Sequence, residues 1–473
     1  MKMKIKIRPI VSILCVTIAL LITSCVDGFK ENELFSSGVT GVTLESPKAD
    51  SVVFTPSADG STVKISWPVV YGAGGYQFSL YNVDDPNNPV AVGLENETID
   101  GCSVQRALSE DTKYKAVVKT LGNEASNNKE ASAATESPYS TLLVATVIPS
   151  GTDLTQYFTT NPIPSSTTEL AYELESGGTY TMSGDVKIGL TNVTLRGNKI
   201  HHPTVTMSAG AFISDGAGFK LKFIDFNCAA FTGKAFIAFN AIQNPLAIAN
   251  TWVTVTSPVA IQSCKITGLA KELVDDNNKK YAVQTLLIKN SIIGQNSTNQ
   301  YFIYMQGGII KDLAISNSTI YNTQVSATNF IQYNASNRVT SNTAWNWASA
   351  SVIVTNSTFW QVAKTGQMAN YAGIVQKNNI LTVQNNIFVD CGNQAVIRRF
   401  CGSSANMTRT YGHNSYWFAG IFATAEISSS YDNSGTHITT DPVLKDPVNA
   451  DFTVGGADQI AVGTGDSRWL PIQ

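Results

Sequence analysis

The sequence predicts an all-β chain of 473 residues, in which a small β-sandwich precedes a long parallel β-solenoid. Three observations predict this fold class. Only 14% of the residues are charged, against about 25% in an average soluble domain. Residues 43–147 show short alternating strands separated by turn signals, which is typical of a sandwich. Beyond residue 165, one short phrase recurs at intervals that suit stacked parallel strands.

The first residues of the chain predict a secretory signal. A basic head precedes an apolar run over residues 10–22, which is shorter than the ~20 residues that a transmembrane helix needs. The run ends in Ile-Thr-Ser and Cys25, which resembles a bacterial lipobox. The resemblance implies removal of residues 1–24, a lipid on the Cys25 thiol, and residues 25–42 as a tether. We therefore expect a lipoprotein anchored in the outer membrane, at the cell surface or on the periplasmic face.

Composition excludes some classes of function. Lys and Arg number 32 and Asp and Glu 35, for a formal net charge of −3, so a basic nucleic-acid-binding surface has no support. The cysteines after Cys25 are odd in number and lack CxxC spacing, which argues against a zinc site or a disulfide framework. Cys391 and Cys401 are left as candidates for a single disulfide. Asn, Ser and Thr take the place of the missing charge.

The first predicted domain covers residues 43–147. Val63, Ile65 and Trp67 alternate onto one face of a strand. The pattern resembles a fibronectin type III module, which implies that Trp67 is its buried second-strand tryptophan. Tyr114 would then be its corner tyrosine, whose hydroxyl bonds back to the backbone. We expect a spacer without chemistry, followed by a linker or N-terminal cap over residues 148–164.

The repeated phrase, apolar-x-Asn-Ser-x-apolar with variations, organises residues 165–473. Its third positions are residues 197, 225, 263, 290, 317, 356, 385 and 414. The separations are 28, 38, 27, 27, 39, 29 and 29, a period near 28 with two insertions of about ten residues. Such a period with β-branched strands predicts a parallel solenoid, in which the third-position Asn side chains of the last five copies stack in register. Amides can satisfy one another in such a stack, whereas like charges ~5 Å apart would repel, which explains the scarcity of charge.

Two further stretches resemble the pectin-lyase-like superfamily. Residues 174–180 followed by 193–197 are similar to its first coil, and the motifs at 441–443, 451–454 and 463–466 are similar to its C-terminal ending. The resemblance covers roughly residues 165–473. It implies a right-handed, single-stranded parallel β-helix and specifies no reaction.

A second repeat lies between the Asn turns, and its central aliphatic column is predicted to face inward. Alternation then places three rows on the outer face. The first is Phe236, Phe302, Phe330, Gly373 and Ala395; the second is Ala238, Tyr304, Gln332, Val375 and Ile397; the third is Asn240, Gln306, Asn334, Lys377 and Arg399. Aromatic rings stack on sugars, amides bond hydroxyls, and cations match uronate carboxylates. We therefore expect Tyr304, Gln306, Gln332, Asn334, Lys377 and Arg399 to bind a polysaccharide, with a pectin-like glycan favoured.

The two insertions, near residues 241–258 and 335–350, follow the same strand and are expected on one side of the solenoid. The first contains Trp252, and the second contains Trp345 and Trp347 in an otherwise polar loop. Loop tryptophans suit stacking on carbohydrate. The alternative is that they cover an exposed edge of the core.

An enzymatic alternative is a polysaccharide lyase, which neutralises a uronate with Ca²⁺ or Arg and removes the adjacent proton with a base. Lys377, Arg398 and Arg399 are the candidates, and Ca²⁺ would be needed only in that case. A glycoside hydrolase needs clustered carboxylates, whereas Asp275 and Asp276 fall in a polar insert. A binding role is favoured over the lyase, with a structural or adhesive role as a third hypothesis. Expected partners are a polysaccharide, the membrane through Cys25, and outer-membrane glycan-import proteins.

Overall fold

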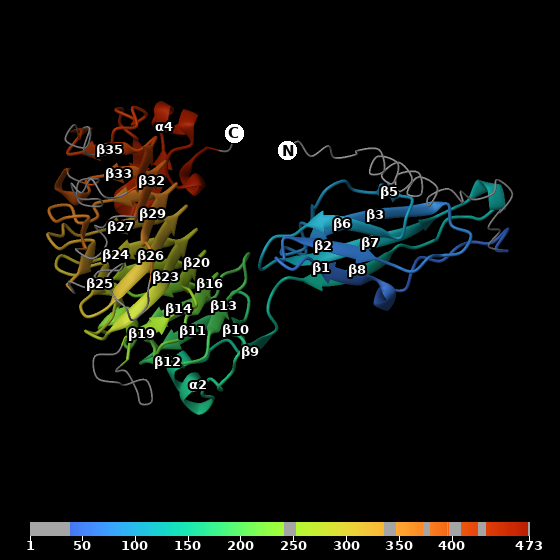
Figure 1. The fold of residues 1–473 in the computed structure, drawn as a ribbon, viewed down its shortest axis with the longest axis horizontal. Helices are drawn as coiled ribbons and strands as arrows, with labels where there is room; N and C mark the ends of the chain where they lie inside the picture. The colour runs from blue at the N-terminus through green and yellow to red at the C-terminus, as the bar shows by residue number, and fades with distance from the viewer. Residues whose placement is uncertain are drawn as a thin grey trace, which may run out of the picture. The chain divides into compact units, whose positions relative to one another are not determined.

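The computed structural model describes residues 38–240, 252–334, 347–371, 379–394, 396, 408–423 and 432–471. The chain divides into two compact units, Met1–Leu142 and Leu143–Gln473 (Figure 1). Strands make up most of the regular secondary structure described in each unit. Within the described residues no helix combines the length and the apolar character needed to cross a membrane.

Unit 1 consists of two antiparallel sheets. The first has the order β1 (Val53–Pro56), β2 (Thr62–Ser66), β6 (Ser103–Ala107). The second has the order β4 (Val90–Ala91), β3 (Gly75–Asn82), β7 (Lys113–Leu121), β8 (Thr135–Ser140), with β5 (Glu97–Ile99) also paired to β3.

The core of unit 1 contains the side chains that the alternation predicted. Val63, Ile65 and Trp67 are all buried, and the Trp67 ring stacks on Phe78 with 5.7 Å between centroids. The Tyr114 hydroxyl accepts a hydrogen bond from the backbone N–H of Ser109 at 2.7 Å. The predicted bond from this tyrosine to the backbone is therefore confirmed.

Unit 2 begins earlier than the repeats indicated. Strand β9 (Ala145–Ile148) pairs in parallel with β10 (Leu170–Leu174), so residues 145–147 belong to unit 2 and not to the sandwich. Between them lies α2 (Leu154–Thr160), which is capped by Asp153, whose side chain accepts the N–H of Gln156. The helix buries Leu154 and Phe158 at the first coil. A lone strand outside the repeat has no periodic signal that could assign it to either unit.

Three long sheets of parallel strands make up unit 2, and the chain takes one strand from each in turn (Figure 1). Sheet 1 contains β9, β10, β13 (Val193–Arg196), β16 (Phe219–Lys222), β20 (Val259–Gln262), β23 (Tyr281–Lys289), β26 (Ile309–Ser316), β29 (Ser351–Thr355), β32 (Ile380–Gln384) and β34 (Thr408–Gly412), with β19 (Val253–Val255) beside β23. Sheet 2 contains β11 (Thr179–Met182), β14 (Thr204–Met207), β17 (Asp225–Asn227), β21 (Lys265–Leu269), β24 (Ile292–Gln295), β27 (Thr319–Asn322), β30 (Thr358–Trp360), β33 (Ile387–Val389) and β35 (Ser415–Phe418), closed by the antiparallel β36 (Ile421–Phe422). Sheet 3 contains β12 (Val186–Gly189), β15 (Phe212–Ser214), β18 (Ala235–Phe239), β22 (Glu272–Asp275), β25 (Ile303–Met305), β28 (Ile331–Tyr333) and β31 (Ala369–Tyr371). The arrangement is consistent with a parallel β-helix.

The turn between sheets 1 and 2 is the position of the recurring phrase. In each of seven successive turns one residue adopts a left-handed backbone, with φ from 45° to 58°: Phe223, Ser263, Asn290, Asn317, Asn356, Asn385 and His413. Asn is among the few residues that tolerate this conformation. The Asn317 amide donates to Asn290 at 2.9 Å, and Asn385 donates to Asn356 at 3.4 Å. The predicted amide stacking is confirmed for these pairs.

Counting the period misplaced two of the turns. Asp225 pairs with Lys265, and Ile387 pairs with Ser415. The turn residues are therefore Phe223 and His413, where the phrase had indicated positions 225 and 414.

The residue after each turn forms a second ladder inside the coil. Side-chain oxygens of Ser291, Ser318, Ser357, Asn386 and Asn414 each accept a backbone N–H from the preceding coil, at 3.0–3.2 Å. All five side chains are fully buried. Neutral polar groups can satisfy backbone donors there without the cost of burying a charge.

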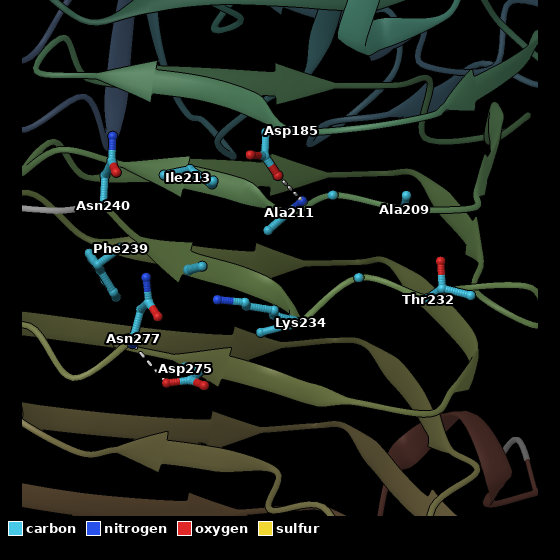
Figure 2. Close-up of a pocket in the computed structure, with 14 residues that line it drawn as sticks. Asp185, Ala209, Ala211, Ile213, Thr232, Lys234, Phe239, Asn240, Asp275 and Asn277 are labelled. Carbon is cyan, nitrogen blue, oxygen red and sulfur yellow. Dashed lines mark hydrogen bonds between the residues drawn. The ribbon is translucent and has the colours of Figure 1, made fainter.

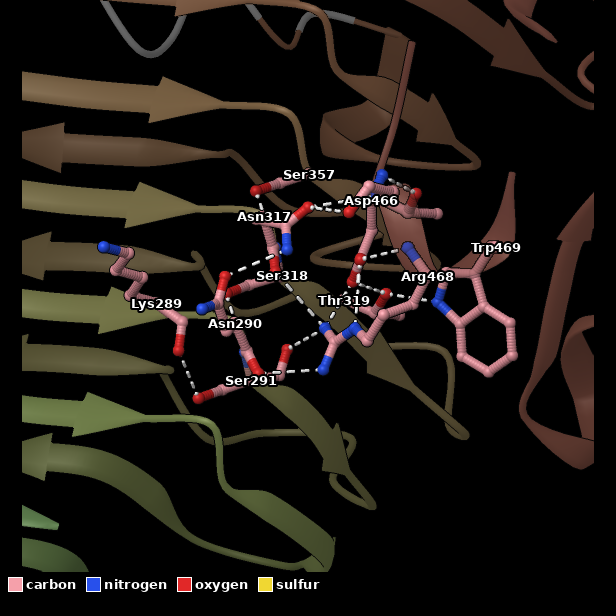
Figure 3. A network of polar contacts seen from close by, with 12 residues as sticks. Lys289, Asn290, Ser291, Asn317, Ser318, Thr319, Ser357, Asp466, Arg468 and Trp469 are labelled. Atoms are coloured by element: carbon pink, nitrogen blue, oxygen red, sulfur yellow. Dashed lines mark hydrogen bonds and ion pairs between the residues drawn. The ribbon is translucent and has the colours of Figure 1, made fainter. Parts of the chain in front are cut away.

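The C-terminal region returns along the outside of the coils. The hairpin of β37 (Leu444–Asp446) and β38 (Asp451–Val454) places Phe452 against Tyr321 and Trp360 on sheet 2. After α4 (Ala457–Val462), residues 463–469, which include η7 (Ser467–Trp469), form a strap along the turns (Figure 3). Arg468 donates to the carbonyls of Asn290 and Asn317 at 2.8 and 3.3 Å. The strap thus bridges adjacent coils from a position far along the sequence.

Candidate functional site

The outer face of sheet 3 carries the predicted strip. Strand pairing places Lys187, Ile213, Ala238, Asp275, Tyr304, Gln332 and Asn370 in one column. Strands ~4.8 Å apart make this column about 29 Å long. Ile237, Ile303 and Ile331 are fully buried, so the predicted inward column is confirmed over these coils. Tyr304 lies on the other side of the sheet and is partly exposed, whereas Gln332 beside it is buried, with 8% of its surface exposed.

The first predicted outer row is wrong for the three members that the structure describes, and its other two, Gly373 and Ala395, lie outside the described residues. Phe236, Phe302 and Phe330 are no more than 2% exposed and belong to the core. The N–H groups of Phe302 and Ile303 both donate to the carbonyl of Phe330, at 2.9 and 3.0 Å. The chain therefore bends at the start of β25, and the side chains of Phe302 and Ile303 both turn inward instead of alternating.

The alignment of coils was also wrong at two places. Strand β22, which ends at Asp275, lies between β18 and β25, where the repeat predicts a polar insert containing Asp275 and Asp276. Ile331 pairs with Ala369, so β31 takes the place in the column that the repeat predicts for residues 373–377. Lys377 itself lies outside the described residues.

Polar side chains on this face form a connected chain of hydrogen bonds. The Asn334 amide donates to the Tyr304 hydroxyl at 2.9 Å, and Gln332 donates to Asn334 at 2.8 Å. Asn329 donates to Gln332 at 2.8 Å. The Tyr304 ring lies 4.4 Å from that of Tyr301, at an interplanar angle of 32°. The predicted residues Tyr304, Gln332 and Asn334 are therefore brought together and held in fixed orientations.

Gln306, the fourth predicted residue, contacts the carboxylate of Asp275, which the sequence pattern does not place in the site. Its amide donates to Oδ1 of Asp275 at 2.9 Å, and the N–H of Asn277 donates to the same oxygen at 2.7 Å. The neighbouring Asp276 has a different role. Its fully buried carboxylate accepts the N–H groups of Gln306, Gly307 and Asn278 at 2.9–3.0 Å, and burial raises its pKa to about 6. Asp276 fixes the following loop, and Asp275 faces outward.

A pocket of about 490 Å³ continues the face beyond Asp275 (Figure 2). Small side chains form much of its floor, among them Ala211, Ala235 and Ala238. Asp185, Lys234, Asn240, Asp275 and Asn277 supply its polar groups. Figure 2 shows Lys234 between Asp185 on one side and Asp275 on the other. A concave site with an apolar floor and a few polar groups is typical of small-molecule and sugar recognition.

The sequence does not predict this pocket, because much of its floor consists of alanine and glycine residues. Ala and Gly carry no chemical signal of their own, and three adjacent coils must stack before their positions coincide. Lys234 stands before β18 and outside the repeat, where no pattern marked it.

The remaining predicted residues divide into two groups. Trp347 is half-buried, packs against the main core, and has the Lys311 ammonium 5.9 Å from its ring centre. Trp252 packs against the same core. For Trp252 and Trp347, these contacts favour the alternative that loop tryptophans cover an edge of the core. Trp345, Arg398, Arg399, Cys25 and Cys401 lie outside the described residues.

The insertions and the candidate disulfide can be placed in part. Both insertions connect a strand of sheet 3 to one of sheet 1, as expected for one side of the solenoid. Cys391 has a free thiol, which donates to the carbonyl of Val389 at 3.2 Å. Among the described residues no group of three or more His, Cys, Asp or Glu side chains could hold a metal ion.

Comparison with known families adds no activity. Three family models match, each described as a domain of unknown function: DUF4992 over residues 2–177, DUF4957 over 178–323 and DUF5123 over 352–469. The comparisons with curated proteins and with solved structures gave no match. The first match ends between β10 and β11, so it extends from unit 1 into the first coil. The family boundaries therefore differ from the boundary between the compact units.

Proposed function

We propose that this chain is a lipid-anchored surface or periplasm-facing protein that binds an extracellular polysaccharide along the outer face of sheet 3. The observation that carries the proposal is the continuity of this face. A partly exposed tyrosine pair, a chain of oriented amides and a pocket with an apolar floor follow one another along this face. A column of outward-facing side chains about 29 Å long suits an extended sugar chain better than a single small molecule.

The chemistry of the face fits sugars. Aromatic rings offer a flat apolar surface for the C–H faces of a pyranose, and amides both donate to and accept from hydroxyls. Because Tyr304, Asn334 and Gln332 already hold one another, little side-chain freedom is lost on binding. On sheet 2, Phe452 covers the outer side chains of Tyr321 and Trp360, which leaves that part of the sheet unsuited to a ligand.

Other parts of the proposal derive from the sequence. Cys25 would carry the lipid, and unit 1 would act as a fibronectin type III-like spacer before a right-handed β-helix. Two sheets, a buried Trp67 stacked on Phe78, and the Tyr114 hydroxyl bond support the spacer assignment. The preference for a pectin-like glycan depended on Lys377 and Arg399.

The test is affinity electrophoresis of the folded protein through gels that contain a panel of plant polysaccharides. We expect at least one glycan to retard the wild-type protein, and Tyr304→Ala combined with Asn334→Ala to restore free mobility. Tyr71→Ala is the matched control, because Tyr71 is 71% exposed and lies in unit 1. Trp345→Ala with Trp347→Ala tests the loop tryptophans separately. If no glycan changes the mobility of the wild-type protein, the proposal is refuted.

A further inference from the structure

The charges on the proposed face alternate in sign. Lys187 stands at one end of the column and Asp275 near its middle, while Asp185 and Lys234 line the pocket between them. A polyuronate carries a negative charge on every sugar ring. Such a ligand would meet a carboxylate wherever it met a cation, so the described face offers it no matched row of positive charge.

Asp275 is the group placed to decide between ligands. Its Oδ1 accepts two hydrogen bonds, from the N–H of Asn277 and the amide of Gln306, which fix the direction of the carboxylate. Within the described part of the chain its Oδ2 accepts none. Asp275 pairs with Tyr304 on one side and Ala238 on the other, where the polar chain meets the pocket. A ligand that lies along the face must pass this oxygen.

An oriented carboxylate with one free oxygen accepts a sugar hydroxyl through a charge-assisted hydrogen bond. The same oxygen repels the carboxylate of a uronic acid, since like charges in partly desolvated surroundings are unfavourable. We infer that the outer face of sheet 3 selects neutral glycans over polyuronates, and that Asp275 determines this specificity. The inference rests on the proposed function and names its class of ligand.

The experiment compares neutral polysaccharides (galactan, arabinan, xylan and a mixed-linkage glucan) with polygalacturonate and alginate, at low and at high salt. The proteins are the wild type, Asp275→Asn and the matched control Asp312→Asn. Asp312 lies on sheet 1, where its carboxylate accepts the Ser351 hydroxyl at 2.7 Å. Circular dichroism spectra establish that each variant is folded.

We expect a neutral glycan to bind the wild-type protein most tightly, with an affinity that salt leaves unchanged. Asp275→Asn should weaken this binding about tenfold or more, because the amide loses the charge-assisted bond. The same variant should bind polygalacturonate as well as or better than the wild type, and Asp312→Asn should match the wild type throughout. Tighter, salt-sensitive binding of polygalacturonate by the wild type would overturn the inference, as would equal affinities of Asp275→Asn and wild type for the neutral glycan. Binding to no polysaccharide of either kind would instead refute the proposed function.

Discussion

Asn386 provides the sharpest test of the internal ladder. Its buried side chain accepts the N–H of Ser357 at 3.0 Å and donates to the carbonyl of Val354 at 2.8 Å and to Oδ1 of Asn414 at 3.1 Å. Asn386→Ala removes all three bonds and leaves their partners inside the coil. The neighbouring Asn385 also carries an amide, but its side chain faces outward and makes one hydrogen bond within the described residues, to Asn356 at 3.4 Å.

The magnitude follows from the groups left without partners. A buried donor or acceptor that loses its hydrogen bond costs about 1–3 kcal/mol. The Ser357 N–H and the Val354 carbonyl are both inaccessible to bulk water, so Asn386→Ala should lower the free energy of unfolding by about 3–5 kcal/mol. Asn386→Ser should recover part of this loss, because Ser already serves as the acceptor at Ser318 and Ser357.

The assay is urea unfolding followed by far-ultraviolet circular dichroism, with Asn385→Gly as the control. Glycine keeps the left-handed backbone at position 385, where φ is 56°, so this variant should lie within about 1 kcal/mol of the wild type. Equal losses for the two variants, or a wild-type midpoint for Asn386→Ala, would refute the argument that the inner ladder satisfies the backbone.

Three further predictions concern single contacts. Arg468→Ala should destabilise unit 2 by about 3–5 kcal/mol in thermal unfolding, because the fully buried Asp466 loses its ion pair. Adding Asp466→Asn to this variant should restore part of the lost stability, because the unpaired buried charge is removed. Burial raises the pKa of Glu272 to about 7. The neutral carboxyl therefore contributes fully to the free energy of unfolding below pH ~4.5, and this contribution is lost as the pH rises through 7. Glu272→Gln should therefore raise the melting temperature at pH 8 and leave it unchanged at pH 4, and equal shifts at both would contradict the assignment. Tyr114→Phe should cost about 1–2 kcal/mol in the unfolding of unit 1, since the Ser109 N–H loses its acceptor, and no change would show that water replaces the hydroxyl.

The sequence predicted the fold well wherever a residue had the same role in every coil. The phrase around Asn290, Asn317, Asn356 and Asn385 marks a left-handed turn, and few residue types tolerate that backbone. Repetition made the turn visible without any knowledge of the structure. The coarse all-β architecture and the inward column at Ile303 followed from the same repetition.

The errors arose where coils differ from one another. Strand β22 has the sequence Glu-Leu-Val-Asp, which lacks the aromatic that marks β25 and β28, so it was hidden in an apparently polar insert. Phe302 violates strict alternation because the chain bends before the strand. Neither a missing marker nor a local bend can be inferred from a period.

The candidate site could be predicted only in its regular part. Tyr304, Gln332 and Asn334 followed from alternation on paired strands. The pocket and the role of Asp275 depend on contacts between coils about 30 residues apart, at positions where the repeat is imperfect. Trp347 shows the reverse case, since an aromatic in a polar loop suggested a ligand while its ring packs on the core.

The strap of residues 463–469 affects how the stacked coils should unfold. Coils of a solenoid contact only their neighbours, so an unstrapped stack can fray from either end one coil at a time. Here Thr464 bonds the carbonyl of His413 and Arg468 bonds that of Asn290, which lie four coils apart in the stack. Fraying of any coil within this span must first release the strap, so the last coils should open together in hydrogen exchange as one cooperative unit. The strap can close only after those coils have formed, which makes its docking a late step of folding.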